Sequence, residues 1–306
     1  MKQKTLAGTI LHRFPVADGV HVVAEEFGQD TQNQPLVFLL HGGGQNRHAW
    51  TATARTLHAA GYRVVSCDAR GHGDSDWDPS GNYELDTLAQ DLMLVRAKFE
   101  SDQPVFAIGA SMGGQTVLCA HLRAPADLWN GIVLVDVTPR PEADGVRRIF
   151  AFMSAHPDGF GKLEDAADAI AAYNPMRPRS TRLEGLHKVL RQRADGRWAW
   201  HWDPAFIAPN VKKMHDPAVW DRYIQEMGDF IFQGARKVTA PILLIRGAMS
   251  DVVSDTTIAE FLDNVPHAEV ADVSNAGHMI AGDNNDVFTR EVLGFLEQVR
   301  RRHSLP

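Results

Sequence analysis

Apolar residues along this chain gather in short continuous runs, and most of the intervals between runs have helical spacing. Eight runs have the length of strands, at residues 8–14, 20–28, 35–42, 62–69, 104–110, 131–137, 241–248 and 268–274. Helix-length segments include residues 49–61, 84–100, 115–122 and 257–265. Continuous apolar runs are typical of strands buried on both faces. The alternation therefore predicts an α/β fold with a doubly wound, mostly parallel sheet of about eight strands, and the first two runs predict an antiparallel edge.

One interval breaks this alternation. Between residues 138 and 237 no buried-strand run appears, and helical segments at 145–155 and 162–173 precede an aromatic stretch, RWAWHWD, at 197–203. This interval is an insertion between two strands of the predicted sheet. We therefore expect a core domain made of residues 1–137 and 238–306, with residues 138–237 as an inserted unit.

Composition excludes several classes of protein. The net charge of −7 over 306 residues is not that of a nucleic-acid-binding protein. The basic cluster 300–302 is expected to end a C-terminal helix, where cations complement the helix dipole. The two cysteines, Cys67 and Cys119, lie in apolar surroundings and predict no disulfide and a reducing compartment. No apolar run is long enough to span a membrane and no signal-peptide pattern is evident, so a cytoplasmic location is expected.

A serine between glycines, Gly109-Ala110-Ser111-Met112-Gly113, stands at the junction of an apolar run and a helical segment. A G-x-S-x-G pattern alone is common, but at a strand-to-helix junction it predicts a sharp turn that exposes the serine hydroxyl at the carboxyl end of the sheet. The alternative is an ordinary turn in which the serine caps the helix. The spacing favours Ser111 as a nucleophile.

A serine nucleophile needs a base, and the base needs an acid that orients it. His278 follows the last strand in a glycine-containing loop, SNAGHM. Two aspartates lie after strands, Asp136 after GIVLV and Asp251 after PILLIRGAMS. The order serine, acid, histidine along the chain favours Asp251 over Asp136.

An oxyanion that forms on an attacked carbonyl requires two hydrogen-bond donors. The backbone N–H of Met112, the residue after the serine, is one candidate. The sequence His41-Gly42-Gly43-Gly44 after the run PLVFLL supplies the other, and Gly43 is the expected donor. A phosphate-binding loop is excluded because no lysine follows and no G-x-G-x-x-G is present.

Taken together, these motifs resemble those of α/β-hydrolase-fold enzymes, and the resemblance covers the chain outside the insertion. The motifs are HGGG, DARGHGDSD at 68–76, GASMGG, GAMSD and AGH. In that family the D-x-R-G-x-G-x-S segment packs beneath the oxyanion loop, which implies this role for Asp68, Arg70, Gly71, Gly73 and Ser75. The family also places a helical cap where this chain has its insertion, which implies a cap at residues 138–237. Epoxide hydrolases and haloalkane dehalogenases of the fold use an aspartate nucleophile, and Ser111 departs from that pattern.

The resemblance implies hydrolysis of a small-molecule carboxylic ester: attack by Ser111, an acyl-enzyme, and its release by water activated through His278. It implies no cofactor, and the sequence shows no metal-ligand spacing. Lactonase, C–C bond hydrolase and perhydrolase activities use the same triad and remain alternatives, as does a ligand-binding receptor with vestigial hydrolysis. We expect a monomer or homodimer, and the sequence does not distinguish them.

Eight aromatic residues of the insertion predict an apolar cap over the site: Phe150, Phe152, Tyr173, Trp198, Trp200, Trp202, Phe206 and Trp220. Three of them alternate in the stretch after the turn signal Asp195-Gly196. Trp198, Trp200 and Trp202 should therefore project from one side of an extended segment, for which the pattern shows no partner strand. We expect at least one of the three to line the substrate pocket.

Overall fold

A nine-stranded sheet forms the centre of the described part of the molecule. The computed structural model describes residues 2–4, 8–17, 19–28, 33–174, 179, 183–274 and 286–303. The strand order is β1-β2-β3-β5-β4-β6-β7-β10-β11. The strands are β1 (Lys2–Lys4), β2 (Ile10–Pro15), β3 (His21–Phe27), β4 (Leu36–Leu40), β5 (Arg63–Cys67), β6 (Val105–Ala110), β7 (Gly131–Val135), β10 (Ile242–Gly247) and β11 (Ala268–Val273).

The sheet is antiparallel at one edge and parallel elsewhere. The pairings β1–β2, β2–β3 and β3–β5 are antiparallel, and those from β5 through β4, β6, β7 and β10 to β11 are parallel. All eight predicted strands are present, and the predicted doubly wound, mostly parallel fold is confirmed. Strand β1, with the sequence KQK, was not predicted because three polar residues give no apolar run.

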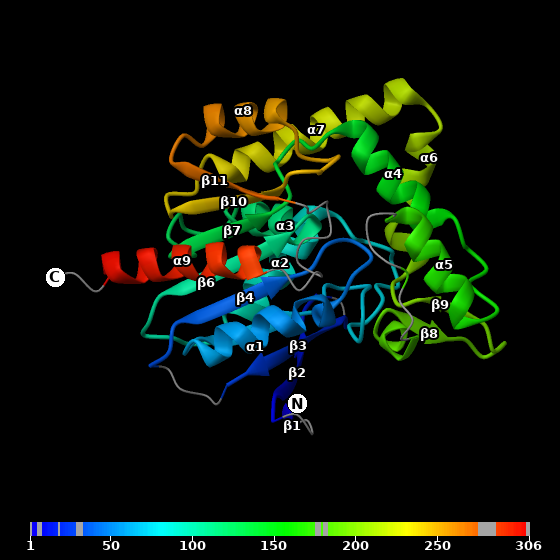
Figure 1. The fold of residues 1–306 in the computed structure, drawn as a ribbon, viewed down its shortest axis with the longest axis horizontal. Helices are drawn as coiled ribbons and strands as arrows, with labels where there is room; N and C mark the ends of the chain where they lie inside the picture. The colour runs from blue at the N-terminus through cyan, green and yellow to red at the C-terminus, as the bar shows by residue number, and fades with distance from the viewer. Residues whose placement is uncertain are drawn as a thin grey trace.

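Both faces of the central strands β4, β5, β6 and β7 are buried, as their continuous apolar runs require. In β4, Phe38 packs in one core cluster, whereas Val37 and Leu39 on the opposite face pack in the other. The first cluster contains residues of α2, α3, α7 and α8, and the second contains residues of α1 and α9 (Figure 1). These helices are α1 (Thr51–Ala59), α2 (Leu85–Arg96), α3 (Met112–Ala120), α7 (Pro217–Ala235), α8 (Asp255–Asn264) and α9 (Asp286–His303).

The remaining elements gather beside one end of the sheet, at the right of Figure 1. They are α4 (Ala143–Ser154), α5 (Leu163–Tyr173), η2 (Leu183–Lys188), β8 (Leu190–Gln192), β9 (Trp198–Trp200), η3 (Pro204–Phe206) and α6 (Ala208–Met214). A short 3-10 helix, η1 (Arg47–Trp50), precedes α1 in the core. The inserted segment is thus mainly helical, as expected, with small apolar clusters of its own.

Two features of the insertion differ from the expectations. β8 pairs with β9 in an antiparallel ribbon, so the tryptophan stretch does have a partner strand; the sequence LRQ of β8 is too short and polar to reveal it. The second half of α7 packs against α3 and contributes Ile231, Phe232 and Ala235 to the core cluster. The last part of the segment expected to be cap therefore packs with the core, because one 19-residue helix runs through both.

Both cysteines are free and buried, and burial raises the pKa of each thiol to about 12. They are therefore protonated at neutral pH and poorly nucleophilic. Within the described residues, no helix has the length and apolar character needed to cross a bilayer.

The contact between α7 and α3 depends on a glycine. A Cβ on Gly234 would lie 2.2 Å from the carbonyl oxygen of Leu118, so any side chain there would push the two helices apart. We predict that Gly234→Ala lowers the free energy of unfolding by about 1–3 kcal/mol. Urea denaturation followed by circular dichroism measures this change.

Gly294→Ala is the matched control. Gly294 lies in α9, and a Cβ there would meet no atom within 4 Å. Alanine is the better helix former, so this substitution should stabilise the protein by about 0.5–1 kcal/mol. Equal effects of the two substitutions would contradict the close packing of α7 on α3.

Candidate active site

Ser111 occupies a strained turn between β6 and α3. Its φ is 46°, in the left-handed region, and its backbone N–H donates to the carbonyl of Val135 on β7 at 3.2 Å. Space around the turn is minimal, since a Cβ on Gly113 would lie 2.4 Å from the carbonyl oxygen of Leu40. Ser111 is the N-cap of α3, yet its side chain makes no capping hydrogen bond. The capping alternative is therefore disfavoured, and the hydroxyl is left available for chemistry.

The loop after β4 lies directly beside Ser111. A Cβ on Gly42 would lie 3.3 Å from the Cβ of Ser111. The N–H of Gly42 donates to Oε1 of Gln45 at 3.0 Å, and the N–H of Gly44 donates to Nε2 of His72 at 3.1 Å. Among the described residues, the N–H of Gly43 between them has no hydrogen-bond acceptor. This arrangement leaves Gly43 as the loop amide available to an oxyanion.

Two buried histidines support this loop. His41 places Nδ1 2.8 Å from the carbonyl of Gly42, and its Nε2 accepts from the N–H of Ala69 at 3.0 Å. His72 places Nδ1 3.1 Å from the carbonyl of Arg70, and its Nε2 is the acceptor for Gly44. Both rings therefore require the neutral tautomer with the proton on Nδ1.

Burial keeps these histidines neutral. It lowers the pKa of His41 to about 4 and, with a smaller contribution from His41, that of His72 to about 3. The two ring centroids are 5.2 Å apart, so a charge on either ring would oppose a charge on the other. His72 was not assigned a role from the sequence, although it stands inside the GHG segment that was singled out.

The segment 68–76 lies beneath the loop and is rich in polar contacts. Asp68 is fully buried and accepts from the backbone N–H of Arg47 at 2.6 Å and from the guanidinium of the same residue. The carbonyl of Asp68 accepts from the hydroxyl of Ser75 at 2.8 Å. Arg70 forms buried ion pairs with Asp78 and Asp91 at 2.6 and 2.5 Å. These contacts agree with the structural role that the resemblance implies for this segment.

The two candidate acids occupy different environments. Asp136 is fully buried after β7, has a φ of 49°, and lines the same cavity as Ser111. Its carboxylate accepts from the N–H of Gly247 at 2.9 Å and from the hydroxyl of Ser250 at 2.7 Å.

Asp251 is instead an exposed residue outside the cavity lining. Its Oδ2 accepts from Nε and Nη2 of Arg148 on α4 at 2.9 and 2.7 Å. A carboxylate engaged by an arginine at the surface is poorly placed to orient a buried imidazole. The geometry thus favours Asp136, the aspartate that chain order ranked second. His278 lies outside the described residues.

The cavity that contains Ser111 lies between the core and the cap and has a volume of about 810 Å³. Gly43, Met112 and Asp136 line it, so the proposed nucleophile, acid and both oxyanion donors border one space. Six of the eight predicted cap aromatics also line it: Phe150, Phe152, Tyr173, Trp200, Trp202 and Phe206.

The three tryptophans of the extended stretch separate into two groups. The rings of Trp200 and Trp202 stack with centroids 4.9 Å apart and line the cavity. Trp198 packs in the cap's own cluster and meets the ring of His187 edge to face. Trp220 is fully buried and donates from Nε1 to the carbonyl of Ala143.

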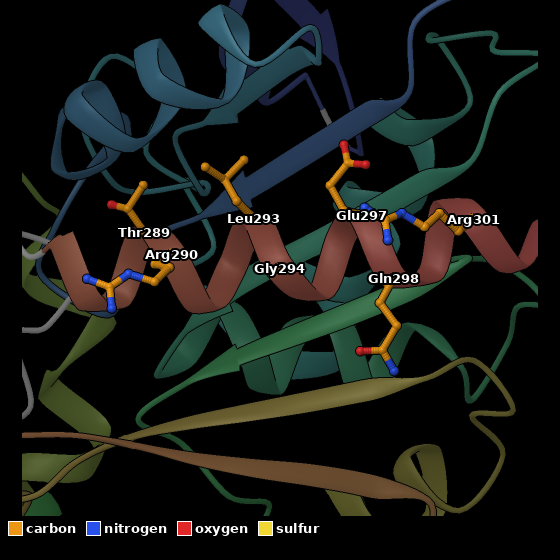
Figure 2. Close-up of a pocket in the computed structure, with 7 residues that line it drawn as sticks. All are labelled: Thr289, Arg290, Leu293, Gly294, Glu297, Gln298 and Arg301. Carbon is orange, nitrogen blue, oxygen red and sulfur yellow. The ribbon is translucent and has the colours of Figure 1, made fainter.

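A hollow on the outer face of α9 carries no comparable chemistry. Figure 2 shows its lining of seven residues of that helix, among them Leu293, Gly294 and Glu297. None of the seven is a serine, cysteine or histidine, so no nucleophile and base are paired there. Within the described ranges, no group of three or more histidine, cysteine or acidic residues could hold a metal ion.

Comparisons with known proteins identify the class. A family model described as the alpha/beta hydrolase fold matches residues 35–284, and the chain belongs to this family. The predicted fold family and the prediction of a hydrolase enzyme are thereby confirmed.

Two relatives and one solved structure show what the chain is similar to. It is 29% identical to the esterase Rv0045c of Mycobacterium tuberculosis over 86% of this chain and 83% of that protein. It is 26% identical to the esterase YbfF of Escherichia coli over 90% of this chain and 98% of that protein. A solved structure of the mycobacterial esterase covers 94% of this chain and 92% of its own, with 25% identity and a TM-score of 0.71.

The depressed pKa of His72 predicts how the free energy of unfolding depends on pH. Burial depresses the pKa of His72 to about 3, so its ring stays neutral in the folded protein down to about that pH. In the unfolded chain the same ring binds a proton below about pH 6.5. The stabilising contribution is thus complete above pH 6.5 and is lost as the pH falls toward 3. Replacing His72 with asparagine should reduce the slope of unfolding free energy against pH between 5 and 6 by up to about 1.4 kcal/mol per pH unit.

Chemical denaturation at a series of pH values measures that slope, and exposed His267 supplies the control as His267→Asn. The control should leave the slope unchanged. A parallel loss of slope in both variants, or in neither, would show that His72 does not titrate as described.

Proposed function

We propose that this protein hydrolyses carboxylic esters through an acyl-enzyme on Ser111, with His278 as the base, Asp136 as its orienting acid, and the N–H groups of Gly43 and Met112 as the oxyanion donors. Ester hydrolysis as a reaction class has the support of the family match and of the two esterase relatives. The observation that carries the residue assignment is the shared cavity, which Ser111, Gly43, Met112 and Asp136 all border.

Each group has a defined task in this scheme. Removal of the hydroxyl proton by the imidazole lets the oxygen of Ser111 attack the ester carbonyl, and the carbonyl oxygen becomes an oxyanion near Gly43 and Met112. The imidazolium returns the proton to the departing alcohol as the tetrahedral intermediate collapses. Water, deprotonated by the same imidazole, then attacks the acyl-enzyme and releases the acid and Ser111.

The choice of Asp136 rests on burial and on hydrogen bonding. Its buried carboxylate is oriented by Gly247 and Ser250, which fixes the direction in which a remaining lone pair can accept from an imidazole N–H. Strands β7 and β10 are parallel neighbours, so acids after either strand reach the same edge of the sheet. Asp251, after β10, is instead held by Arg148 at the surface.

The cap favours substrates with an apolar portion. Trp200, Trp202 and Phe206 form a largely apolar part of the cavity wall, and Phe206 also packs against the loop, since a Cβ on Gly43 would lie 3.3 Å from its ring. Exclusion of water by such a wall strengthens the interaction between the oxyanion and its donors. A medium-length acyl chain is the substrate class that this lining fits.

The first prediction concerns the nucleophile. Ser111→Ala should lower kcat for a p-nitrophenyl ester by about 10⁴-fold or more, because no other hydroxyl would then stand in the turn. Alanine fits the turn as well as serine, so the melting temperature should change little. Turnover that survives in a folded Ser111→Ala variant would place the nucleophile elsewhere.

The second prediction distinguishes the two acids. Asp136→Asn should lower kcat by about 10³- to 10⁴-fold, because an amide cannot hold the imidazole in the required tautomer. Asp251→Asn removes only a surface ion pair and should change kcat by less than about threefold. Steady-state kinetics on the two matched variants provides the measurement, and the reverse pattern would assign the acid to Asp251.

The third prediction concerns the cap tryptophans. Trp200→Ala enlarges the cavity wall and should shift the preference between p-nitrophenyl butyrate and p-nitrophenyl decanoate by about tenfold or more in kcat/KM. Trp198→Ala is the matched control, since that ring packs in the cap cluster and does not line the cavity. The control should lower thermal stability and leave the chain-length profile unchanged. Identical profiles for both variants would remove Trp200 from the substrate site.

A further inference from the structure

A second cavity of about 320 Å³ adjoins the first. It lies beside β3 and α1, and the two cavities share two lining residues, His48 of η1 and Lys188 at the end of η2. Arg55 of α1 lines the second cavity only. One residue of η1 and one of the cap therefore stand where the two cavities meet, and Arg55 adds a third basic residue beside the second cavity.

The cations at this junction lack carboxylate partners. Within the part of the chain that the structure describes, neither Lys188 nor Arg55 forms an ion pair, although Arg47, Arg63 and Arg70 all do. One carboxylate, Glu25, also lines the second cavity and shares Arg47 with Asp68 and Asp74. It accepts from the hydroxyl of Thr9 at 2.6 Å and lies 3.8 Å from Nε of Arg47.

His48 adds a hydrogen-bonding group. Its backbone N–H donates to Oδ1 of Asn46 at 3.1 Å, but its ring has no hydrogen-bond partner among the residues described. Burial, and after it the nearby charge of Arg47, lowers the pKa of the imidazole, so the ring is neutral at pH 7 and retains one N–H donor. Like Lys188, His48 lines both cavities.

A hydrogen bond connects the junction to the segment that follows the oxyanion loop. Asn46 is buried three residues after Gly43, and its Nδ2 donates to the carbonyl of Lys188. This hydrogen bond fixes the backbone of Lys188 against the segment that carries the oxyanion donor.

Carboxylates also line the main cavity, and its other described arginine or lysine besides Lys188, Arg179, pairs with Asp168. Glu84 precedes α2 and Glu226 lies on α7, and both line the main cavity. Asp86 also lines it but is neutralised by Arg123 at 2.9 and 2.7 Å. The carboxylates on α7 and just before α2 would repel an anionic group, and the cations at the junction would attract it. An anionic substrate would therefore bind with that group toward the junction.

We infer that Lys188, His48 and Arg55 form an anion-binding subsite at the junction of the two cavities, and that the esters this protein takes carry an anionic group, a carboxylate or a phosphate-type group, remote from the reacting carbonyl. Leu186 and Val189 flank Lys188 and line the main cavity, so a hydrocarbon spacer has an apolar wall to follow. The inference rests on the proposed ester hydrolysis for its catalytic part only. Anion binding itself needs no turnover.

Matched p-nitrophenyl esters test the inference by kinetics. The octanoate ester ends in a methyl group, the monoester of suberate replaces that methyl with a carboxylate, and the ester of 7-phosphonoheptanoate carries a phosphonate there. The ratio of kcat/KM for an anionic ester to that for octanoate should fall about threefold to tenfold in Lys188→Gln. Lys188→Arg should retain most of the ratio, and 0.5 M salt should reduce it in the unsubstituted protein.

Lys212→Gln is the control, because Lys212 lies exposed on α6 outside both cavities. It should leave the ratio unchanged. Whichever anionic ester shows the larger effect identifies the group as carboxylate or phosphate-type. A ratio that does not respond to Lys188→Gln with either ester overturns the subsite.

Binding without turnover separates this inference from the proposed function. Calorimetry on the Ser111→Ala variant should show that suberate monoamide binds about threefold to tenfold more weakly after Lys188→Gln is added. If esters are not hydrolysed but this weakening appears, the subsite stands and the proposed reaction fails. If esters are hydrolysed and the monoamide binds equally to both variants, the reaction stands and the subsite fails.

Discussion

The backbone of Ser111 is held at a φ of 46° where β6 ends and α3 begins, and the surrounding geometry depends on this turn. An L-residue with a side chain pays a conformational cost in that region, so the turn persists only because its neighbours determine it. The carbonyl of Leu40 leaves no room for a side chain at Gly113, and the carbonyl of Val135 accepts the N–H of Ser111. Three adjacent parallel strands thus hold one serine at the edge of the sheet.

The same edge brings the other groups together. β4 leads into the loop of Gly43, and β7 leads into Asp136, whose φ of 49° matches the strain at Ser111. Ligands bind at the carboxyl ends of strands in open α/β sheets because successive loops converge there. The cap closes this edge through contacts such as the hydrogen bond from the hydroxyl of Tyr83 to the carboxylate of Asp203. The strained turns at Ser111 and Asp136 and the cavity that they border therefore all depend on the order of the parallel strands.

The histidines beneath the loop show how burial serves the site. A neutral imidazole can donate from one nitrogen and accept at the other, which His41 and His72 both do. The ring of Phe206 from the cap lies 4.7 Å from the ring of His72, edge to face. The cap therefore contributes to the dry environment that keeps His72 neutral and its acceptor nitrogen directed at Gly44.

Eight strands could be predicted because each forms a continuous apolar run. The core helices could be predicted because the intervals between those runs have helical spacing. The pairing of β9 with β8 could not be predicted, because the three residues LRQ of β8 carry no periodic signal. Ser111 and Gly43 follow from motifs that are local in sequence.

The acid could not be identified in the same way. Asp136 and Asp251 both follow strands, and only burial and the contact with Arg148 separate them. The position of the cavity wall, including the separation of Trp198 from Trp200, likewise depends on packing between segments distant in sequence.

In the proposed mechanism the hydroxyl of Ser111 becomes covalently acylated during turnover. Mass spectrometry of peptides from the unsubstituted protein tests this step after reaction with a fluorophosphonate, which traps an activated serine as a stable adduct. We expect one adduct per chain, on the peptide that contains Ser111, with its rate of formation rising as the imidazole loses its proton. An adduct on another residue, or none in a protein that turns over esters, would contradict it.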